Sequence, residues 1–443
     1  MVGIDLSGAQ IQDGRARVER LQLKNLELVQ KDLVSVTKKF GQFDYILCHG
    51  VYSWVPEKVQ QAILRICREN LSARGIAYIG YKTYPGWKAH EIVRDAMLLR
   101  AGEREGGAER LAYGRGMLDF LHQHARRDSV LARAIEQDHA MIRTFDAAYV
   151  IHDFLASTNA PCYFRDFAAR ADEHDLAYLA DADPPLMFAT NYGDEIARLL
   201  FDECGHSQVL LEQYLDFVTD RAFRRSLLVR KERAGDIGYN VQATRLRGLH
   251  VAAQLACAQG EARIDDSPQP FSAANGNAVV LDNAVAKLAA EALTRAWPFT
   301  MGFDELHRVV QSKLPETEQA RNVTEGRLVA FFNSIVVQGI GRYRLTPLVR
   351  QGEHPCVDKA ARDYPAYLPQ GQAVHTFNGW HEPVLLNPVM HYLLPHLDGS
   401  HTREALLAML ARAVSEGTLT IEAAGAQATL AAELDRVLAL LCA

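Results

Sequence analysis

Residues 43–81 read FDYILCHGVYSWVPEKVQQAILRICRENLSARGIAYIGY. The apolar run FDYILC (43–48) predicts a β-strand, and GIAYIGY (75–81) predicts another. Between them, PEKVQQAILRICREN (56–70) has the spacing of an amphipathic helix. Strand, helix and strand in this order are typical of a parallel sheet with crossover helices. This stretch therefore predicts an α/β sheet of the doubly wound, Rossmann-like kind.

The residues before this stretch repeat the pattern and add two acidic side chains. Val2-Gly3-Ile4 and LELV (26–29) are short apolar runs, and Asp5 and Asp32 follow them. Carboxyl ends of neighbouring parallel strands share one crevice, so the spacing favours a nucleotide site there. Asp5 would accept from ribose hydroxyls and Asp32 from an adenine amino group. The alternatives are a helix-capping carboxylate for Asp5 and a surface-turn aspartate for Asp32.

Two further loops fall at the same edge of the predicted sheet. Cys48, His49 and Gly50 follow the strand at 43–48, and glycine permits close approach of backbone to a ligand. The second loop is YKTYPGW (81–87), which is rich in aromatic residues. These aromatics, together with Tyr52 and Trp54 of the first loop, either wall a pocket or pack in the core.

The rest of the chain is mostly helical in pattern, so the predicted class is α/β followed by mostly α. The predicted domains are a partial sheet domain, a helical domain with one further strand near 176–182, a linker, a winged-helix-like module and a C-terminal helical domain. In the same order, their boundaries are 1–90, 91–240, 241–278, 279–345 and 346–443. The linker is assigned from its polar, Gly- and Ser-containing composition.

Composition restricts the function classes. The chain has 443 residues, a net charge of −6 and 48% hydrophobic residues, which is typical of a globular protein. Seven scattered cysteines without a C-x-x-C pair favour reduced thiols in the cytoplasm. No apolar run is long enough to span a membrane, and no signal-peptide pattern is present. The acidic balance disfavours a nucleic-acid partner, and no metal site is predicted.

The motifs GIDLS (3–7), KDL (31–33), FDYILCHGVYSWVP (43–56) and YKTYPGW (81–87) resemble those of class I S-adenosylmethionine-dependent methyltransferases. More narrowly, they resemble the subgroup with a methyltransferase regulatory domain, which includes bacterial protein lysine methyltransferases. FLASTNAPCYFRDFAARADEHDLAYLADA (154–182) resembles the start of that regulatory region.

The resemblance implies roles for two groups of residues. The cofactor-binding group is Asp5, Leu6, Asp32, Leu33, Cys48, His49 and Gly50. The methyl-acceptor group is Tyr52, Trp54, Tyr81, Tyr84 and Trp87. The implied cofactor is S-adenosylmethionine, and the implied partner is a protein substrate whose lysine amine is desolvated by the aromatic rings before in-line methyl transfer.

The sequence departs from the family pattern in two places. The family has a first strand and a Gly-rich loop before the position of Val2, so the predicted sheet is N-terminally incomplete. Two explanations are open: a start assigned too late, which we favour, or a true truncation that has lost catalysis. The second departure is Lys82, where the family tends to have asparagine. A lysine near a sulfonium is unfavourable unless it points away or meets a carboxylate.

Three functions follow from these observations. The favoured one is a protein lysine methyltransferase. The alternative is a catalytically inactive methyltransferase fold that serves as a protein-binding module. A DNA-binding regulator built on the winged-helix-like module is disfavoured by the acidic charge.

Overall fold

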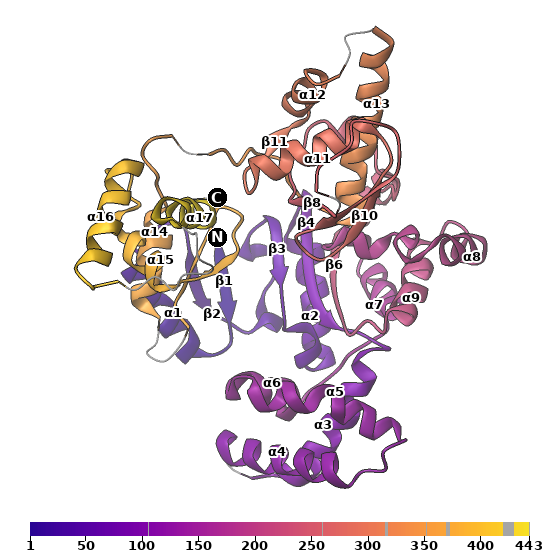
Figure 1. Ribbon diagram of the computed structural model, residues 1–443. Helices are drawn as coiled ribbons and strands as arrows, with labels where there is room; N and C mark the ends of the chain where they lie inside the picture. Colours follow the sequence, from indigo (N-terminus) through magenta and orange to yellow (C-terminus); the bar gives the residue numbers. More distant parts are fainter. Residues whose placement is uncertain are drawn as a thin grey trace. The chain divides into compact units, whose positions relative to one another are not determined.

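The computed structural model describes residues 1–104, 106–258, 260–314, 318–350, 352–368, 373–419 and 429–442, without the side chains of 318–322. The chain forms two compact units (Figure 1). One unit is Lys31–Tyr239, and the other combines Met1–Gln30 with Asn240–Ala443. We call them the sheet unit and the composite unit.

A four-stranded sheet organises the sheet unit. Its strand order is β3-β4-β6-β5, with β3 and β4 parallel and β6 antiparallel to both of its neighbours. Helix α2 (Glu57–Asn70) connects β3 to β4, as the sequence predicts. The strands are β3 (Phe43–Cys48), β4 (Leu71–Lys82), β5 (Leu176–Asp181) and β6 (Phe223–Arg230).

The two faces of β4 have different surroundings. Ala77, Ile79 and Tyr81 belong to a buried cluster that includes side chains of α2 and α7 (Phe164–Glu173). Because successive strand residues point to opposite faces, Tyr78, Gly80 and Lys82 share the other face. This second face carries the candidate site.

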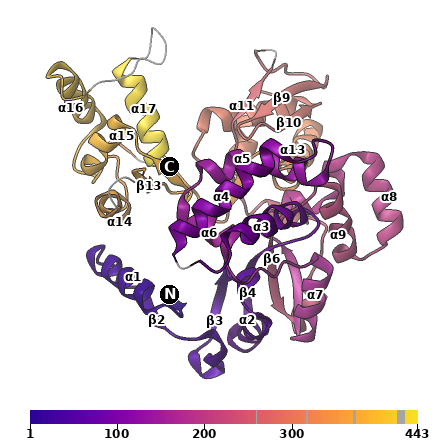
Figure 2. The same ribbon diagram turned by 90° about the horizontal axis from the view of Figure 1, so that it is seen from below.

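Helices make up the rest of the sheet unit. Four of them lie together in Figure 2. They pack around a core of their own, with Val93, Met97 and Phe154 among its fully buried members. They are α3 (Trp87–Ala101), α4 (Gly107–His124), α5 (Val130–Thr144) and α6 (Ala147–Leu155). The remaining two are α8 (Asp194–Cys204) and α9 (Gln208–Val218). The helical pattern predicted for residues 88–150 is confirmed.

One part of the helical prediction is wrong. Residues 210–228 have helical spacing in the sequence, but the helix ends at Val218 and Phe223–Arg230 forms a strand. The sequence does not show the alternation of apolar and polar residues that is typical of a strand. The reason is that the buried face of this strand carries Arg224 and Ser226, which have no exposed surface. Arg224 donates to both oxygens of Asp216, each at 2.8 Å, and to Oε2 of Glu212 at 2.9 Å. Burial raises the pKa of the Glu212 and Asp216 carboxyl groups above the usual range. The nearby Arg224 cation lowers the same pKa values and so offsets part of this effect.

The composite unit begins with a strand–helix–strand segment. It consists of β1 (Val2–Asp5), α1 (Gly8–Arg20) and β2 (Glu27–Gln30), and the two strands pair in parallel. The α1 N-cap is Ser7, whose Oγ accepts from the backbone N–H of Gln10.

The described residues between 240 and 345 form two small sheets and four helices around a shared core. Part of the predicted linker is ordered strand, because Phe271 and Ala273 bury their side chains in this core. The strands are β7 (His250–Ala252), β8 (Leu255–Cys257), β9 (Gln269–Ala273), β10 (Ala278–Leu281), β11 (Met301–Gly302) and β12 (Arg342–Arg344). The helices are α10 (Ala243–Leu246), α11 (Ala284–Ala296), α12 (Phe303–Gln311) and α13 (Glu318–Gln338).

The C-terminal part has a separate core built largely from leucine and valine. Its strands β13 (His375–Phe377) and β14 (Pro383–Leu385) form an antiparallel pair. Its helices are α14 (Lys359–Asp363), α15 (Pro388–Leu393), α16 (Arg403–Ser415) and α17 (Leu430–Leu441).

A buried lysine lies in α11. The side chain of Lys287 has no exposed surface, and its Nζ donates to Oδ1 of Asp265 at 2.8 Å and to the Asp265 carbonyl at 3.0 Å. Asp265 is half-exposed. The Lys287 ammonium and the Ser267 hydroxyl hold the pKa of Asp265 well below its usual range. Burying an ammonium is costly unless it is paired, so Asp265 compensates for the position of Lys287.

We expect Asp265→Asn to lower the melting temperature, because the substitution weakens the partner of a buried ammonium. A carboxyl with a depressed pKa contributes stability above its ordinary pKa of about 3.9 and loses it as pH falls through the folded value. The difference in melting temperature between wild type and Asp265→Asn should therefore shrink as pH falls from about 5 toward 2. Glu291→Gln, which removes the solvent-accessible partner of Lys313, is the control and should have a smaller effect. Equal effects at all pH values would contradict this assignment.

Candidate functional site

The carboxyl end of β3 presents three of the predicted cofactor residues. Burial raises the pKa of the Cys48 thiol to about 12, so this side chain is a neutral group and not a nucleophile. The Nδ1 of His49 lies 2.7 Å from the hydroxyl of Tyr78, on the site face of β4. Gly50 has a φ of +67°, and a Cβ there would meet nothing within 4 Å. The turn thus needs glycine and leaves space beside it.

Gly80 lets the His49 side chain approach β4 closely. A Cβ at this position would lie 2.8 Å from His49 Nδ1 and 3.0 Å from Phe223 Cζ. The rings of His49 and Phe223 contact each other edge-on, with centroids 5.6 Å apart. A side chain larger than hydrogen at residue 80 would therefore displace one of these two rings.

Lys82 lies in a box of aromatic rings at the end of β4. Its Nζ is 3.9 Å from the ring centroid of Trp87, 5.7 Å from that of Phe223 and 6.0 Å from that of Trp54. The same Nζ pairs with Oδ2 of Asp153 at 2.9 Å. The side chains of Lys82 and Asp153 are only 14% and 6% exposed. We call Trp54, Trp87, Phe223 and Asp153 the ammonium box, since cation–π attraction and one carboxylate together suit an alkylammonium group.

Backbone contacts fix the chain around the box. The Lys82 N–H donates to Oγ of Ser53 at 2.8 Å, and the Ser53 carbonyl accepts from the N–H of Ala160. Thr83 Oγ1 donates to the carbonyl of Cys162 at 2.9 Å. The 3₁₀ turn Tyr52–Trp54, the end of β4 and the segment after α6 are thereby tied together.

Helix α6 supplies the acidic wall of the box. Besides Asp153, it contributes His152, whose ring lies 4.8 Å from that of Trp54, and Tyr149. Burial and the neighbouring Asp153 carboxylate raise the pKa of Tyr149 to about 12, so it stays a neutral phenol. Among the described residues, the buried Nε1 of Trp87 has no hydrogen-bond partner.

The structure separates the predicted acceptor residues into two groups. Trp54 and Trp87 line the box. Tyr52 and Tyr81 instead lie in the hydrophobic core, where Tyr81 stacks on Phe167 at a centroid distance of 4.1 Å. Strand alternation explains this placement, because Tyr81 points to the opposite face of β4 from Lys82. The alternative reading of the aromatics as core residues applies to these two tyrosines.

Tyr84 lies in the loop between β4 and α3. Its hydroxyl donates to Oε1 of Glu91 at 2.5 Å, and Lys88 Nζ lies 3.7 Å above its ring. Burial and the Glu91 carboxylate raise the pKa of Tyr84. This tyrosine makes a local cluster with α3, and no contact with the box is described.

The predicted adenine and ribose residues are each held by a local turn. Asp32 Oδ1 accepts from the N–H of Val34 at 2.9 Å, and Leu33 packs at the edge of the core below α2. Asp5 Oδ1 accepts from the N–H of Ser7 at 2.7 Å, and Leu6 is exposed. A carboxylate has several acceptor positions, so these turns are compatible with ligand binding. Asp5 and Leu6 belong to the composite unit, and the other predicted residues belong to the sheet unit.

Two residues of the box are not apparent from the sequence. Asp153 lies 71 positions from Lys82, and Phe223 belongs to the strand that the helical pattern conceals. The one indication in the sequence was Lys82. A lysine near the sulfonium of the implied cofactor is unfavourable unless it meets a carboxylate or points away. The structure shows the carboxylate partner.

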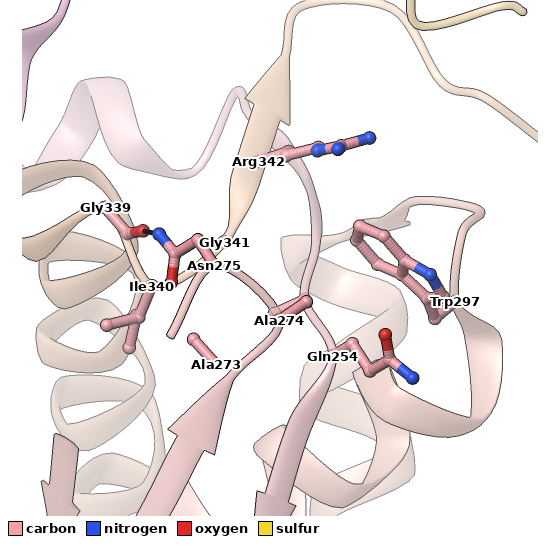
Figure 3. A pocket seen from close by; sticks show the side chains of 10 residues that line it. Gln254, Ala273, Ala274, Asn275, Trp297, Gly339, Ile340, Gly341 and Arg342 are labelled. Atoms are coloured by element: carbon pink, nitrogen blue, oxygen red, sulfur yellow. Dashed lines mark hydrogen bonds between the residues drawn. The ribbon is translucent and has the colours of Figure 1, made fainter. Parts of the chain in front are cut away.

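The composite unit contains a small pocket near Arg342. Its volume is about 170 Å³, and Gln254, Asn275 and Trp297 are among its lining residues (Figure 3). The Arg342 guanidinium lies 5.0 Å from the Trp297 ring centroid and pairs with Glu382 at 2.9 Å. Ligand pockets commonly measure about 300–1,000 Å³, so this one is too small for a nucleoside cofactor. None of the predicted site residues lines it.

The described residues lack a metal-ligand cluster and a membrane-spanning helix. No group of three or more His, Cys, Asp and Glu side chains has an arrangement that could hold a metal ion. No described helix combines the length and the apolar character needed to cross a membrane.

Comparison with protein families accounts for three segments of the chain. Residues 1–75 match the model of a methyltransferase domain, and residues 146–230 match that of a predicted methyltransferase regulatory domain. Residues 353–443 match a C-terminal winged-helix domain of PKMT. The chain belongs to the methyltransferases that carry a regulatory domain. The winged-helix match lies within residues 346–443, for which a C-terminal helical domain was predicted.

Solved structures and sequence relatives agree with this family. PKMT2 from Rickettsia typhi, solved in complex with AdoHcy, superposes with a TM-score of 0.82 at 25% identity, over 99% of this chain and 86% of that one. An uncharacterized protein of Rickettsia prowazekii is 28% identical over 438 residues, which are 96% of this chain and 77% of that protein. A second uncharacterized protein of that organism is 31% identical over 179 residues, or 40% of this chain and 72% of the relative.

Proposed function

We propose that this protein is an S-adenosylmethionine-dependent methyltransferase whose acceptor is the side-chain amine of a lysine in a protein. The observation that carries the acceptor class is the ammonium box, which already holds one alkylammonium group between Trp87 and Asp153. The family assignment and the likeness to Rickettsia typhi PKMT2 in complex with AdoHcy support the cofactor.

The predicted cofactor residues suit an adenosyl ligand. Asp5 and Asp32 offer carboxylate oxygens to hydroxyl and amino donors, and the space beside Gly50 leaves its backbone accessible. Cys48 is neutral, so it places no negative charge beside the bound group. S-adenosylmethionine supplies a methyl group activated by a sulfonium.

The chain's own part in catalysis is to position and desolvate the acceptor. A lysine amine must lose its proton before it can attack, and its ordinary pKa is about 10.4. The aromatic faces of Trp54, Trp87 and Phe223 exclude water, which favours the neutral amine. The Asp153 carboxylate acts in the opposite direction, because it favours the ammonium form, and it is the group in the box that can accept the proton as the amine attacks. The same faces then bind the methylated ammonium product by cation–π attraction. No covalent enzyme intermediate is required, because alignment and exclusion of water supply the catalysis.

The proposal predicts that Trp87→Ala separates acceptor binding from cofactor binding. Methyl transfer to polylysine should fall about tenfold or more, because a desolvated cation–π contact contributes up to about 2 kcal/mol. Binding of S-adenosylhomocysteine, measured by calorimetry, should remain. Trp297→Ala in the composite unit is the control and should retain transfer.

Two results would count against the proposal. Absence of both S-adenosylhomocysteine binding and methyl transfer in the folded wild type would reject it in favour of a protein-binding module. Cofactor binding with methylation only of non-lysine acceptors would reject the acceptor class. Circular dichroism of each variant shows whether it is folded.

A further inference from the structure

The ammonium box has an occupant that belongs to the chain itself. Lys82 Nζ makes the contacts that an incoming substrate lysine would need, namely the ring of Trp87 and the carboxylate of Asp153. We propose that Lys82 is an internal competitor that closes the box until a substrate ammonium displaces it. This proposal rests on the function proposed above and adds a regulation of the same site.

Charge makes the two occupants exclusive. The box contains one carboxylate, and Asp153 is almost completely buried. Two ammonium groups in the same aromatic enclosure would repel each other across a poorly solvated space, with only one counter-ion between them. A substrate lysine therefore enters as Lys82 leaves.

The Lys82 side chain can leave the box while its backbone stays in place. Its backbone is fixed by the hydrogen bond from its N–H to Ser53 Oγ, but its ammonium sits on a flexible four-carbon stem that keeps some exposure to solvent. Rotation of the stem would move the charge into water without disturbing β4.

The box also contains a hydrogen bond that Lys82 cannot make. The indole N–H of Trp87 is buried and has no partner among the described residues, although Trp87 itself is only 3% exposed. An ammonium is a donor only, so Lys82 cannot accept from this N–H. Lys82 therefore leaves a buried polar group of the box without a hydrogen-bond acceptor, which favours its displacement.

The test uses tetramethylammonium as the probe and the full chain as the protein. Binding is followed by tryptophan fluorescence and by the shift in melting temperature, with sodium chloride at equal ionic strength as the salt reference. Lys82→Ala empties the box and should bind the probe at least tenfold more tightly than the wild type. Lys82→Met removes the charge but keeps the volume filled, so it should gain little.

Three further variants make the result specific. Lys88→Ala removes the neighbouring lysine above the Tyr84 ring and should behave as the wild type. Lys82→Ala combined with Asp153→Asn should lose the gain, because the counter-ion is gone. Lys82→Asn also shortens the side chain. It is used in place of Lys82→Ala if the alanine variant does not fold.

The outcomes separate this proposal from the proposed function, because probe binding needs neither S-adenosylmethionine nor methyl transfer. Equal binding by wild type and Lys82→Ala would show that Lys82 does not compete. Failure of both folded Lys82→Ala and Lys82→Asn to bind would show that the box is not an ammonium site. If methylation of polylysine is observed, its KM should be lower for Lys82→Ala than for the wild type, and an unchanged KM would overturn the regulatory role.

Discussion

Replacing Arg224 with methionine is expected to lower the free energy of unfolding by about 3–5 kcal/mol, which is the usual effect of breaking a buried ion pair. The guanidinium has no exposed surface and is held by Asp216 and Glu212. It also lies 3.7 Å from the ring centroid of Phe164. Arg224 also lies 3.8 Å from the buried carboxylate of Asp181. Without Arg224, Asp181 and Asp216 keep only Arg221, at 2.9 and 3.7 Å, and Glu212 keeps no cationic partner among the described residues.

The neighbouring residue provides a matched control for this experiment. Arg225 is an arginine of the same strand, but it pairs with Asp183 at the surface, where both side chains are 42% exposed. Arg225→Met should therefore cost only about 0–1 kcal/mol. Urea denaturation followed by circular dichroism measures both variants. Equal losses for the two would mean that the buried network contributes no more than a surface pair.

A compensating variant tests the cause of the loss. Arg224→Met combined with Glu212→Gln and Asp216→Asn removes the uncompensated charges along with the arginine. It should recover part of the stability, because neutral amides are less costly to bury than carboxylates. If the combined variant is less stable than Arg224→Met, hydrogen bonds of the carboxyls and not their charge dominate.

Gly80→Ala is expected to reduce the rate of methyl transfer about a hundredfold. The added Cβ would lie 2.8 Å from His49 Nδ1, so the ring must move away from the rim where the reacting groups are predicted to meet. Displacing a positioning group by about 1 Å commonly costs about 10²-fold in rate. The loss of stability should be about 1–3 kcal/mol, as for other overpacked sites, so the variant should remain folded.

The control for this variant is Gly238→Ala. A Cβ at residue 238 meets nothing within 4 Å, and its φ is not in the left-handed region. Methyl transfer to polylysine, with S-adenosylhomocysteine binding measured in parallel, distinguishes a displaced site from an unfolded one. Wild-type activity in Gly80→Ala would show that His49 and Phe223 do not border the reacting groups.

The sequence predicted those elements whose buried face is apolar. The run FDYILC forms β3 within the expected bounds, and α2 begins one residue after Pro56. Strand β6 was not predicted, because Arg224 and Ser226 occupy its buried face. Arg224 is paired with two carboxylates of α9, and Ser226 is hydrogen-bonded to Tyr81 of β4. Periodicity in a single sequence does not show that an arginine is buried, even though its carboxylate partners lie only 8 and 12 positions away.

The candidate site was predicted in part for the same reason. Trp54 and Trp87, both of the predicted acceptor group, lie beside each other with ring centroids 6.2 Å apart. Tyr81 was assigned to the site because it is aromatic and begins the loop at 81–87. Side chains alternate between the two faces of β4, and Tyr81 lies on the face that packs in the core. Asp153 required the tertiary fold, since nothing in the local sequence links α6 to the end of β4.

The ion pair between buried Lys287 of α11 and half-exposed Asp265 constrains how this protein can evolve. Loss of Asp265 while Lys287 is present leaves an ammonium inside an apolar core, so that intermediate is selected against. Loss of Lys287 to an apolar residue first leaves only a half-exposed aspartate, which is then free to vary. Substitution of Lys287 should therefore precede substitution of Asp265. Relatives that lack an acidic residue at position 265 should carry an apolar residue at position 287.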